Sequence, residues 1–247
     1  MAHLDQAIEI ALTLGYVSLF IWIISTLGFF KGLGVPIKWF QAVFVLKVLS
    51  GVLLYLIYTR YYTDRSTADI FKYFDDSAVL YDAAFRQPMD FLRMIFGVGN
   101  DNSYFNQTYY QVMNHWNRPY ASTLGNDTHT IIRFNALARF VSLGFYNVHS
   151  VILNFLSLIG LTGIFIFLRR LLPDTPRVLF LIVFLFPGVI FWGSGVLKEG
   201  LLFFGIGMLL YSVVSLLPIS DEERSNHKWF CGLSAIGFIV FLTTVKS

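Results

Sequence analysis

The side chains best suited to chemistry in this sequence are carboxylates within one polar stretch, residues 61–96. Six aspartates fall inside it: Asp64, Asp69, Asp75, Asp76, Asp82 and Asp90. Apolar residues recur among them with helical spacing, at Ile70, Phe71, Phe74, Ala78, Tyr81 and Phe85. This pattern predicts an amphipathic helix over about 67–86, lying beside a bilayer, with one face buried. We expect its aromatic residues Phe74, Tyr81 and Phe85 to be buried.

The position of each carboxylate on this helix decides what it can do. Asp69 and Asp76 lie seven residues apart, so both should point away from the apolar face, whereas Asp75 should lie at its border. A carboxylate at a membrane surface can act as a general base toward a hydroxyl group or hold a divalent cation. We therefore take Asp75, Asp76 and Asp69 as candidate catalytic residues. The alternative is a solvated helix face with ion pairs such as Lys72 with Asp76.

A second candidate site surrounds Lys198 and Glu199, in a very short connection between two apolar segments. A lysine where a helix leaves the membrane can bind a lipid phosphate as a point charge. Gly193 and Gly195, just before it, would permit close packing against a neighbouring helix. The alternative is a lysine that extends to the headgroups and pairs with Glu199.

A third candidate site comprises the basic residues Arg118, His129, Arg133 and Arg139. Arginine side chains at the headgroup level suit an anionic lipid head, although ordinary anchoring at the membrane interface explains them equally well. The histidines of the chain lack ligand spacing such as His-x-x-x-His, so no metal site is predicted from them. A divalent cation bound by the aspartates is the one cofactor that the sequence leaves open.

The composition places these candidate sites in a membrane protein. Of 247 residues, 56% are hydrophobic and 13% are charged, whereas soluble domains have about 25% charged residues. The net charge of +3 is spread along the chain without a basic block, which argues against a nucleic-acid partner. The single cysteine, Cys231, excludes a disulfide framework within the chain.

The apolar segments predict an all-α integral membrane protein with one polytopic domain over residues 1–247. Six spans are expected, at about 8–30, 40–58, 146–168, 178–197, 201–217 and 229–245. The loop 59–145 would hold amphipathic interfacial helices. Pro187 should bend or break the fourth span. Lys47, inside the second span, either extends to the nearer Lys-rich end or meets a partner inside the bundle.

Lysine and arginine in the short connections predict the orientation of these spans. One side has Lys31, Lys38, Arg169, Arg170, Arg177, Arg224 and Lys228, and the opposite short ends have Lys198 and Lys246. The richer side is expected to be cytoplasmic. The loop 59–145 and Lys198 should therefore lie together on the side away from the cytoplasm.

Two segments resemble the C-type integral-membrane glycosyltransferases, which include protein O-mannosyltransferases and bacterial aminoarabinose transferases. Residues 69–81, with Phe-Asp-Asp-Ser-Ala-Val-Leu-Tyr, look like the Asp-x-Ala-x-x-Tyr-type element of that superfamily, and residues 186–200 are similar to a segment of uncharacterised bacterial relatives. The resemblance covers about residues 59–200. It implies a protein of the bacterial inner (plasma) membrane that takes a sugar from a polyprenyl-phosphate donor, with its active site facing away from the cytoplasm.

The same resemblance implies roles for individual residues. Asp75 or Asp76 would be the base that activates the acceptor hydroxyl. The residues expected to bind substrate are Tyr81, Arg133, Arg139, Lys198, Glu199 and His129. The acidic loop follows the second span here but the first span in better-known members, so the choice between Asp75 and Asp76 stays open. Members usually have more spans, so the chain would be a fragment or lie outside the family.

A second function explains the sequence as well: a non-enzymatic membrane subunit or transporter component whose long loop docks a partner. A proton or ion path needs ionisable groups inside spans, and only Lys47 qualifies. A docking subunit is therefore favoured over a pump. In a transferase, Asp75 and Asp76 should open into a pocket shared with Lys198, whereas a docking subunit should present them on an open surface.

Overall fold

The computed structural model describes residues 2–62, 64–65, 68–116, 128–216 and 226–246. Within these ranges the chain is helical and contains no β-strand, which confirms the predicted all-α class. The α-helices are α1 Ala2–Thr26, α2 Ile37–Arg60, α3 Asp69–Arg86, α4 Pro88–Phe96, α5 Ser103–Thr108, α6 Thr128–Ser142, α7 Tyr146–Leu171, α8 Pro176–Phe184, α9 Pro187–Trp192, α10 Lys198–Leu216 and α11 Asn226–Lys246. Short 3-10 turns cover Gly28–Phe30 and Tyr110–Val112.

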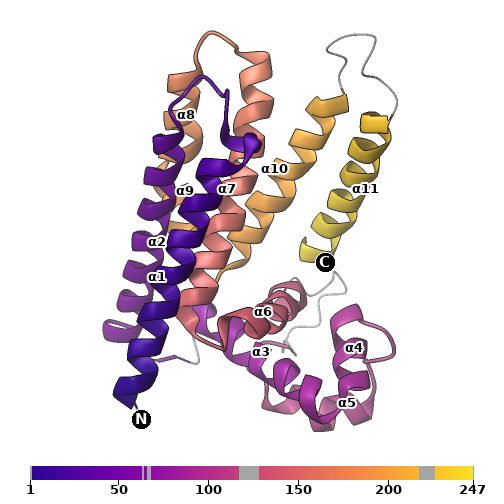
Figure 1. Ribbon diagram of the computed structural model, residues 1–247. Helices are drawn as coiled ribbons and strands as arrows, with labels where there is room; N and C mark the ends of the chain where they lie inside the picture. The colour runs from indigo at the N-terminus through magenta and orange to yellow at the C-terminus, as the bar shows by residue number, and fades with distance from the viewer. Residues whose placement is uncertain (1, 63, 66–67, 117–127, 217–225, 247) are drawn as a thin grey trace.

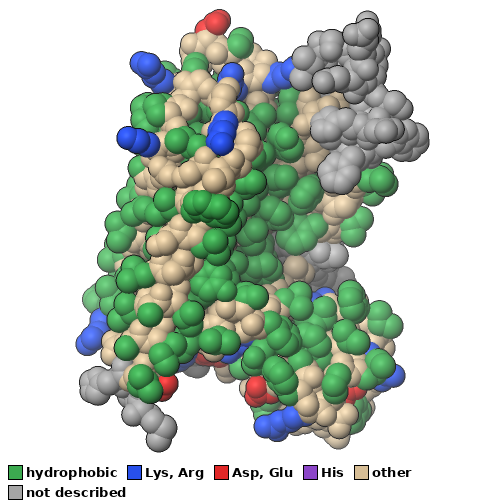
Figure 2. Space-filling view, viewed as in Figure 1, with side chains coloured by type: hydrophobic (Ala, Val, Ile, Leu, Met, Phe, Trp, Pro, Cys, Tyr) green, Lys and Arg blue, Asp and Glu red, His purple; other side chains and the backbone are tan. Residues whose placement is uncertain are grey.

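These helices form two groups (Figure 1). The long helices α1, α2, α7 and α10 form a bundle together with α8 and α9, and α11 packs on α10. The helices α3 to α6 form a smaller group at one end of the bundle. Figure 2 shows a mostly hydrophobic outer surface along the bundle, with charged side chains mainly toward its two ends. Such a surface is typical of helices surrounded by lipid.

Four helices are long and apolar enough to cross a membrane: Leu4–Thr26 within α1, and the whole of α2, α7 and α10. They coincide with four of the six predicted spans. The last predicted span, 229–245, falls on α11, Asn226–Lys246, within which the described residues Gly232–Thr243 form a shorter apolar stretch. The count of six spans therefore stays a prediction.

The predicted fourth span, 178–197, is not one continuous helix, and its crossing of the membrane stays a prediction. The α8 helix ends at Phe184, α9 covers only Pro187–Trp192, and the chain is then non-helical until Lys198. Pro187 lacks a backbone N–H donor, and Phe186 before it is extended, with ψ at 122°. Proline imposes both effects, so the break expected at Pro187 is confirmed.

The α7 and α10 helices run parallel and touch at glycines. A methyl group on Gly200 would lie 3.6 Å from the carbonyl oxygen of Leu153, and further along Gly160 of α7 meets Gly207 of α10. Residue numbers rise in the same direction on both helices, so residues 172–197 must carry the chain back along the bundle. Glycine at such a crossing lets two helix backbones come into contact.

The two glycines predicted to pack closely behave differently. A methyl group on Gly193 would lie 3.0 Å from the ring of Phe203 and 3.1 Å from the Nζ atom of Lys47, which confirms close packing there. A methyl group on Gly195 would lie 3.6 Å from Leu54 of α2, so Gly195 also lies against a neighbouring helix, but at an ordinary contact distance.

The group α3 to α6 packs around one apolar core, which it shares with residues of α7 and of the start of α10. Ile70 and Leu80 of α3 belong to it, together with Ile131 of α6 and Phe105 of α5. The predicted helix over 67–86 corresponds to α3. The α3 and α6 helices pack against each other along most of their length.

The predicted buried face of α3 is correct only for its first half. Phe74 is 7% exposed and Tyr81 is half-buried, but Phe85 is 66% exposed, so its predicted burial is wrong. Phe85 lies in the last turn of α3, where its ring contacts Tyr81 and Phe140 at the rim of the group, with centroids 5.1 and 5.9 Å away.

Candidate functional site

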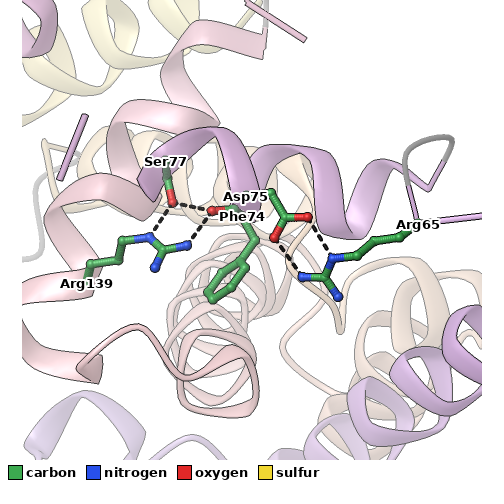
Figure 3. Close-up of polar contacts among 5 residues, drawn as sticks. All are labelled: Arg65, Phe74, Asp75, Ser77 and Arg139. Carbon is green, nitrogen blue, oxygen red and sulfur yellow. Dashed lines mark hydrogen bonds and ion pairs between the residues drawn. The ribbon is translucent and has the colours of Figure 1, made fainter. Parts of the chain in front are cut away.

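Asp75 forms a partly solvent-exposed ion pair with Arg65. The guanidinium of Arg65 donates two hydrogen bonds to its carboxylate, of 2.7 and 2.6 Å (Figure 3). The two side chains are 34% and 50% exposed respectively, and exposed pairs contribute only about 0.2–1 kcal/mol. The hydrogen bond to Asp75 raises the pKa of Arg65. The pair therefore has the fork geometry of a charged carboxylate and guanidinium, and it can open at little cost.

Asp76 lies next to Asp75 but is buried, at 2% exposed. Its two oxygens accept backbone N–H bonds from Asn114 and His115, of 2.8 and 2.7 Å. Burial raises the pKa of Asp76, and the two backbone bonds act against this effect. Asp76 was predicted to point away from the apolar face of α3, and it is nevertheless buried because the chain around residues 114–115 covers that other side.

The other predicted residues of α3 lie at its two ends. Asp69 is the first residue of the helix, with its side chain 57% exposed, and its carboxylate lies 3.6 Å from Lys72 and 3.7 Å from His115. Lys72 therefore pairs with Asp69, while the predicted partner Asp76 bonds the backbone. Tyr81 packs against Phe140 with ring centroids 4.9 Å apart. Neither residue shares the environment of Asp75.

Arg139 fastens α6 to α3. Its Nε donates to Ser77 Oγ at 2.8 Å, and its Nη2 donates to the carbonyl oxygen of Phe74 at 2.7 Å (Figure 3). The guanidinium also lies 4.2 Å above the centre of the Phe74 ring, within the range of a cation–π contact. Burial lowers the pKa of Arg139, while the nearby charge of Asp75 acts in the opposite direction. Arg139 therefore acts as a positioning residue, because it holds Phe74, the residue directly before Asp75.

Arg133 and His129 serve a different part of the group. Arg133 Nε donates to the carbonyl oxygen of Met94 at 2.8 Å, in the last turn of α4, and burial lowers its pKa. The ring of His129 stacks on Trp116 with centroids 3.9 Å apart. Arginine at a helix C-terminus satisfies carbonyl groups left without helical partners. Arg118 lies outside the described residues, so the predicted basic site is not brought together here.

The start of α10 packs against the same core as α3. Val196 and Leu201, on either side of Lys198, belong to the apolar cluster that includes Phe74. Lys198 and Glu199 are both half-buried, and Oε2 of Glu199 is buried without a hydrogen-bond partner. The two predicted segments therefore share one core, and a pocket common to Asp75 and Lys198 stays a prediction.

The sequence did not identify the role of Arg65, and it left the position of the Lys47 side chain open. Arg65 precedes α3 by four residues, outside any helical spacing rule, and no signal marks it as the partner of Asp75. Lys47 does not extend to a membrane surface: it is fully buried, and its Nζ donates to the carbonyl oxygen of Gly193 at 2.7 Å. Of the two interpretations of Lys47, the partner inside the bundle is correct.

No group of three or more His, Cys, Asp or Glu side chains comes together as metal ligands in the described part of the chain. Asp76 uses both carboxylate oxygens for backbone bonds, and Asp75 is engaged by Arg65. A divalent cation here would have to displace Arg65 from Asp75.

Compared with protein-family models, curated proteins and solved structures, the chain gives no match to any of them. Only the short motifs at residues 69–81 and 186–200 therefore support a relation to the C-type glycosyltransferases. This relation stays a resemblance.

Proposed function

We propose that this chain is a glycosyltransferase that moves a sugar from a polyprenyl-phosphate donor to an acceptor hydroxyl, on the side of the membrane away from the cytoplasm. The observation that carries the proposal is the Asp75–Arg65 pair, a partly exposed carboxylate and a guanidinium next to the ends of apolar helices. A lipid-linked donor would reach this position while its polyprenyl chain stays in the bilayer.

Asp75 is the better base of the two neighbouring aspartates. Its oxygens bind Arg65, a side chain that can move away, whereas both oxygens of Asp76 accept backbone N–H bonds. A general base must come within hydrogen-bond reach of the hydroxyl whose proton it takes. By accepting that proton, Asp75 makes the acceptor oxygen a stronger nucleophile toward the sugar carbon, which loses the lipid phosphate.

Arg65 and Lys198 are the proposed phosphate-binding residues. The guanidinium fork that now holds the Asp75 carboxylate matches two oxygens of a phosphate equally well. Transfer of Arg65 from Asp75 to the donor phosphate would leave the carboxylate free for the acceptor. Arg139 is left out of this role because its guanidinium is committed to Ser77 and the Phe74 carbonyl.

Turnover of a radiolabelled polyprenyl-phosphate sugar in membranes with and without the protein tests the proposal. Asp75→Asn should lower turnover by about 10²–10⁴-fold, because the amide cannot accept the proton. Asp82→Asn is the matched control: Asp82 is exposed and lies two turns further along the same helix. Full activity of Asp75→Asn, at wild-type protein levels, would remove Asp75 from the mechanism.

One observation favours the alternative of a docking subunit. The helices α3 to α6 expose large apolar side chains, with Phe85 at 66%, Met89 at 64% and Phe96 at 73% exposure, and Figure 2 shows hydrophobic side chains over much of this group. Such residues suit a protein partner or the bilayer surface. Absence of donor turnover from the wild-type chain, together with a partner that is lost on Phe85→Ser, would establish docking in place of transfer.

A further inference from the structure

Polar side chains form a stripe on the buried side of α7. Tyr146, Ser150, Asn154 and Ser157 follow one another at intervals of four, four and three residues, which puts them on one side of the helix. All four are less than a tenth exposed, and the neighbouring His149 is fully buried. At a rise of 1.5 Å per residue the stripe is about 16 Å long, which is about half the thickness of the hydrocarbon layer.

Several polar atoms along this stripe have no partner. Within the described residues, the buried atoms without a hydrogen bond include His149 Nε2, Asn154 Oδ1, Ser157 Oγ, Ser194 Oγ and Glu199 Oε2. We call the residues of the stripe, with His149, Ser194 and Glu199, the polar seam. A buried polar atom without a hydrogen bond has lost its contact with water and gained no partner in exchange. Five such atoms in adjoining segments indicate that a hydrogen-bonding partner belongs there.

The inner end of the polar seam reaches Lys47. A methyl group on Gly51 of α2 would lie 2.5 Å from Ser150 Oγ, 2.9 Å from the Ser194 carbonyl oxygen and 3.2 Å from Asn154 Nδ2. Asn154 also donates to the backbone carbonyl oxygen of Lys47 at 3.2 Å. The ammonium group of Lys47 bonds to the Gly193 carbonyl and forms no ion pair with a described carboxylate.

The outer end of the polar seam lies directly beside the candidate site. The ring of Phe74, next to Asp75, contacts His149 and Tyr146 with centroids 4.9 and 5.4 Å apart. Tyr146 also packs against Tyr55 near the end of α2, at 5.1 Å. The polar seam therefore runs from the group α3 to α6 into the middle of the bundle.

The chemistry of the atoms without partners selects the ligand. Asn154 Oδ1 and a Glu199 carboxylate oxygen only accept hydrogen bonds, the Lys47 ammonium only donates, and the hydroxyl groups do both. An anion would be repelled by the oxygen atoms that only accept hydrogen bonds, and a metal ion would be repelled by the ammonium group of Lys47. Neither ligand therefore suits the whole set. Water satisfies both kinds of group, and buried waters typically make about three hydrogen bonds.

We propose that the polar seam holds a file of water molecules that gives Lys47 proton exchange with the side of the membrane where α3 to α6 lie. Ionisable groups within membrane helices commonly mark such paths. Tyr146, His149 and Glu199 are the titratable groups along it, and Lys47 is its end point. The inference stands independently of the proposed sugar transfer.

X-ray radiolysis of the native protein in lipid nanodiscs tests the inference, because radicals formed from bound water label the side chains beside it. Tyr146, His149 and Lys47 are compared with Phe165 and Phe180, which are equally buried but belong to the apolar cluster of the bundle. After correction for intrinsic reactivity, mass spectrometry should show several-fold faster labelling of the three seam residues.

Equal and slow labelling of both sets would overturn the proposal, and background labelling of Lys47 alone would overturn its link to the water file. A matched pair of variants adds a second readout. Ser157→Ala removes a hydroxyl without a protein partner, whereas Ser212→Ala removes one that donates to the Met208 carbonyl at 2.8 Å. Only Ser157→Ala should slow the labelling of Lys47, and an equal effect of both would count against bound water.

Discussion

Replacing Gly207 by alanine adds one methyl group at the contact between α7 and α10. That methyl would lie 2.6 Å from Cα of Gly160 and closer still to its carbonyl group, whereas ordinary contacts begin at 3.4 Å. Because these are backbone atoms, no change of rotamer relieves the overlap. The two helices must separate by roughly 1 Å, which disturbs their contact on both sides of the crossing.

The magnitude follows from two opposing effects. Overpacking a well-packed contact costs about 1–3 kcal/mol, and more where the neighbour cannot yield. Alanine is better than glycine in a helix by about 1 kcal/mol. The neighbour of Gly207 is backbone, so we expect Gly207→Ala to destabilise the protein by about 2–3 kcal/mol or more. Gly237→Ala is the control, since no atom lies within 4 Å of a methyl group there.

Thermal unfolding in detergent, followed by tryptophan fluorescence, measures the difference. Gly207→Ala should melt well below the wild type, and Gly237→Ala should melt at or slightly above it. Gly163→Ala should also melt low, because its methyl group would meet the carbonyl of Gly207. If Gly207→Ala has the same melting temperature as Gly237→Ala, then α7 and α10 do not cross at these glycines. The parallel arrangement of the two helices is then refuted.

Two further predictions concern Asp76 and the orientation of the chain. Burial raises the pKa of Asp76 above 3.8, so the folded state holds this proton more tightly than the unfolded chain does. The wild type should therefore gain stability relative to Asp76→Asn as the pH falls from about 7 toward 4. A constant difference in melting temperature between the two proteins over this range would contradict the raised pKa of Asp76. Single cysteines at Asn102 and Asp174, in a Cys231→Ser background, report orientation: an impermeant reagent outside intact cells should label position 102 only, and labelling of position 174 would reverse the predicted topology.

The sequence predicted α3 correctly but not which of its carboxylates is buried. Spacing of apolar residues such as Ile70 and Phe74 identifies the face that packs on α6. It says nothing about the opposite side, where residues 114–115 cover Asp76. These residues follow a short 3-10 turn and have no periodic pattern. The role of Arg65 was hidden for the same reason, because it bonds Asp75 from outside any helix.

The contrast between Pro187 and Lys47 shows where sequence reasoning stops. Proline acts on its own peptide bond and on the residue before it, so the break between α8 and α9 can be predicted locally. Lys47 bonds to Gly193, which is 146 residues away. That carbonyl is available only because α9 ends there, a consequence of tertiary packing.

The burial of α7 has a consequence for how the protein is assembled in the membrane. Among the four long apolar helices, α7 is mostly buried, whereas α1 is almost entirely uncovered. Insertion depends on hydropathy, so α1 can remain in lipid without neighbours. The α7 helix would expose Asn154 and its serines to hydrocarbon until α2 packs beside it. Its assembly is complete only when α10, made later in synthesis, closes over Gly160 and Gly163.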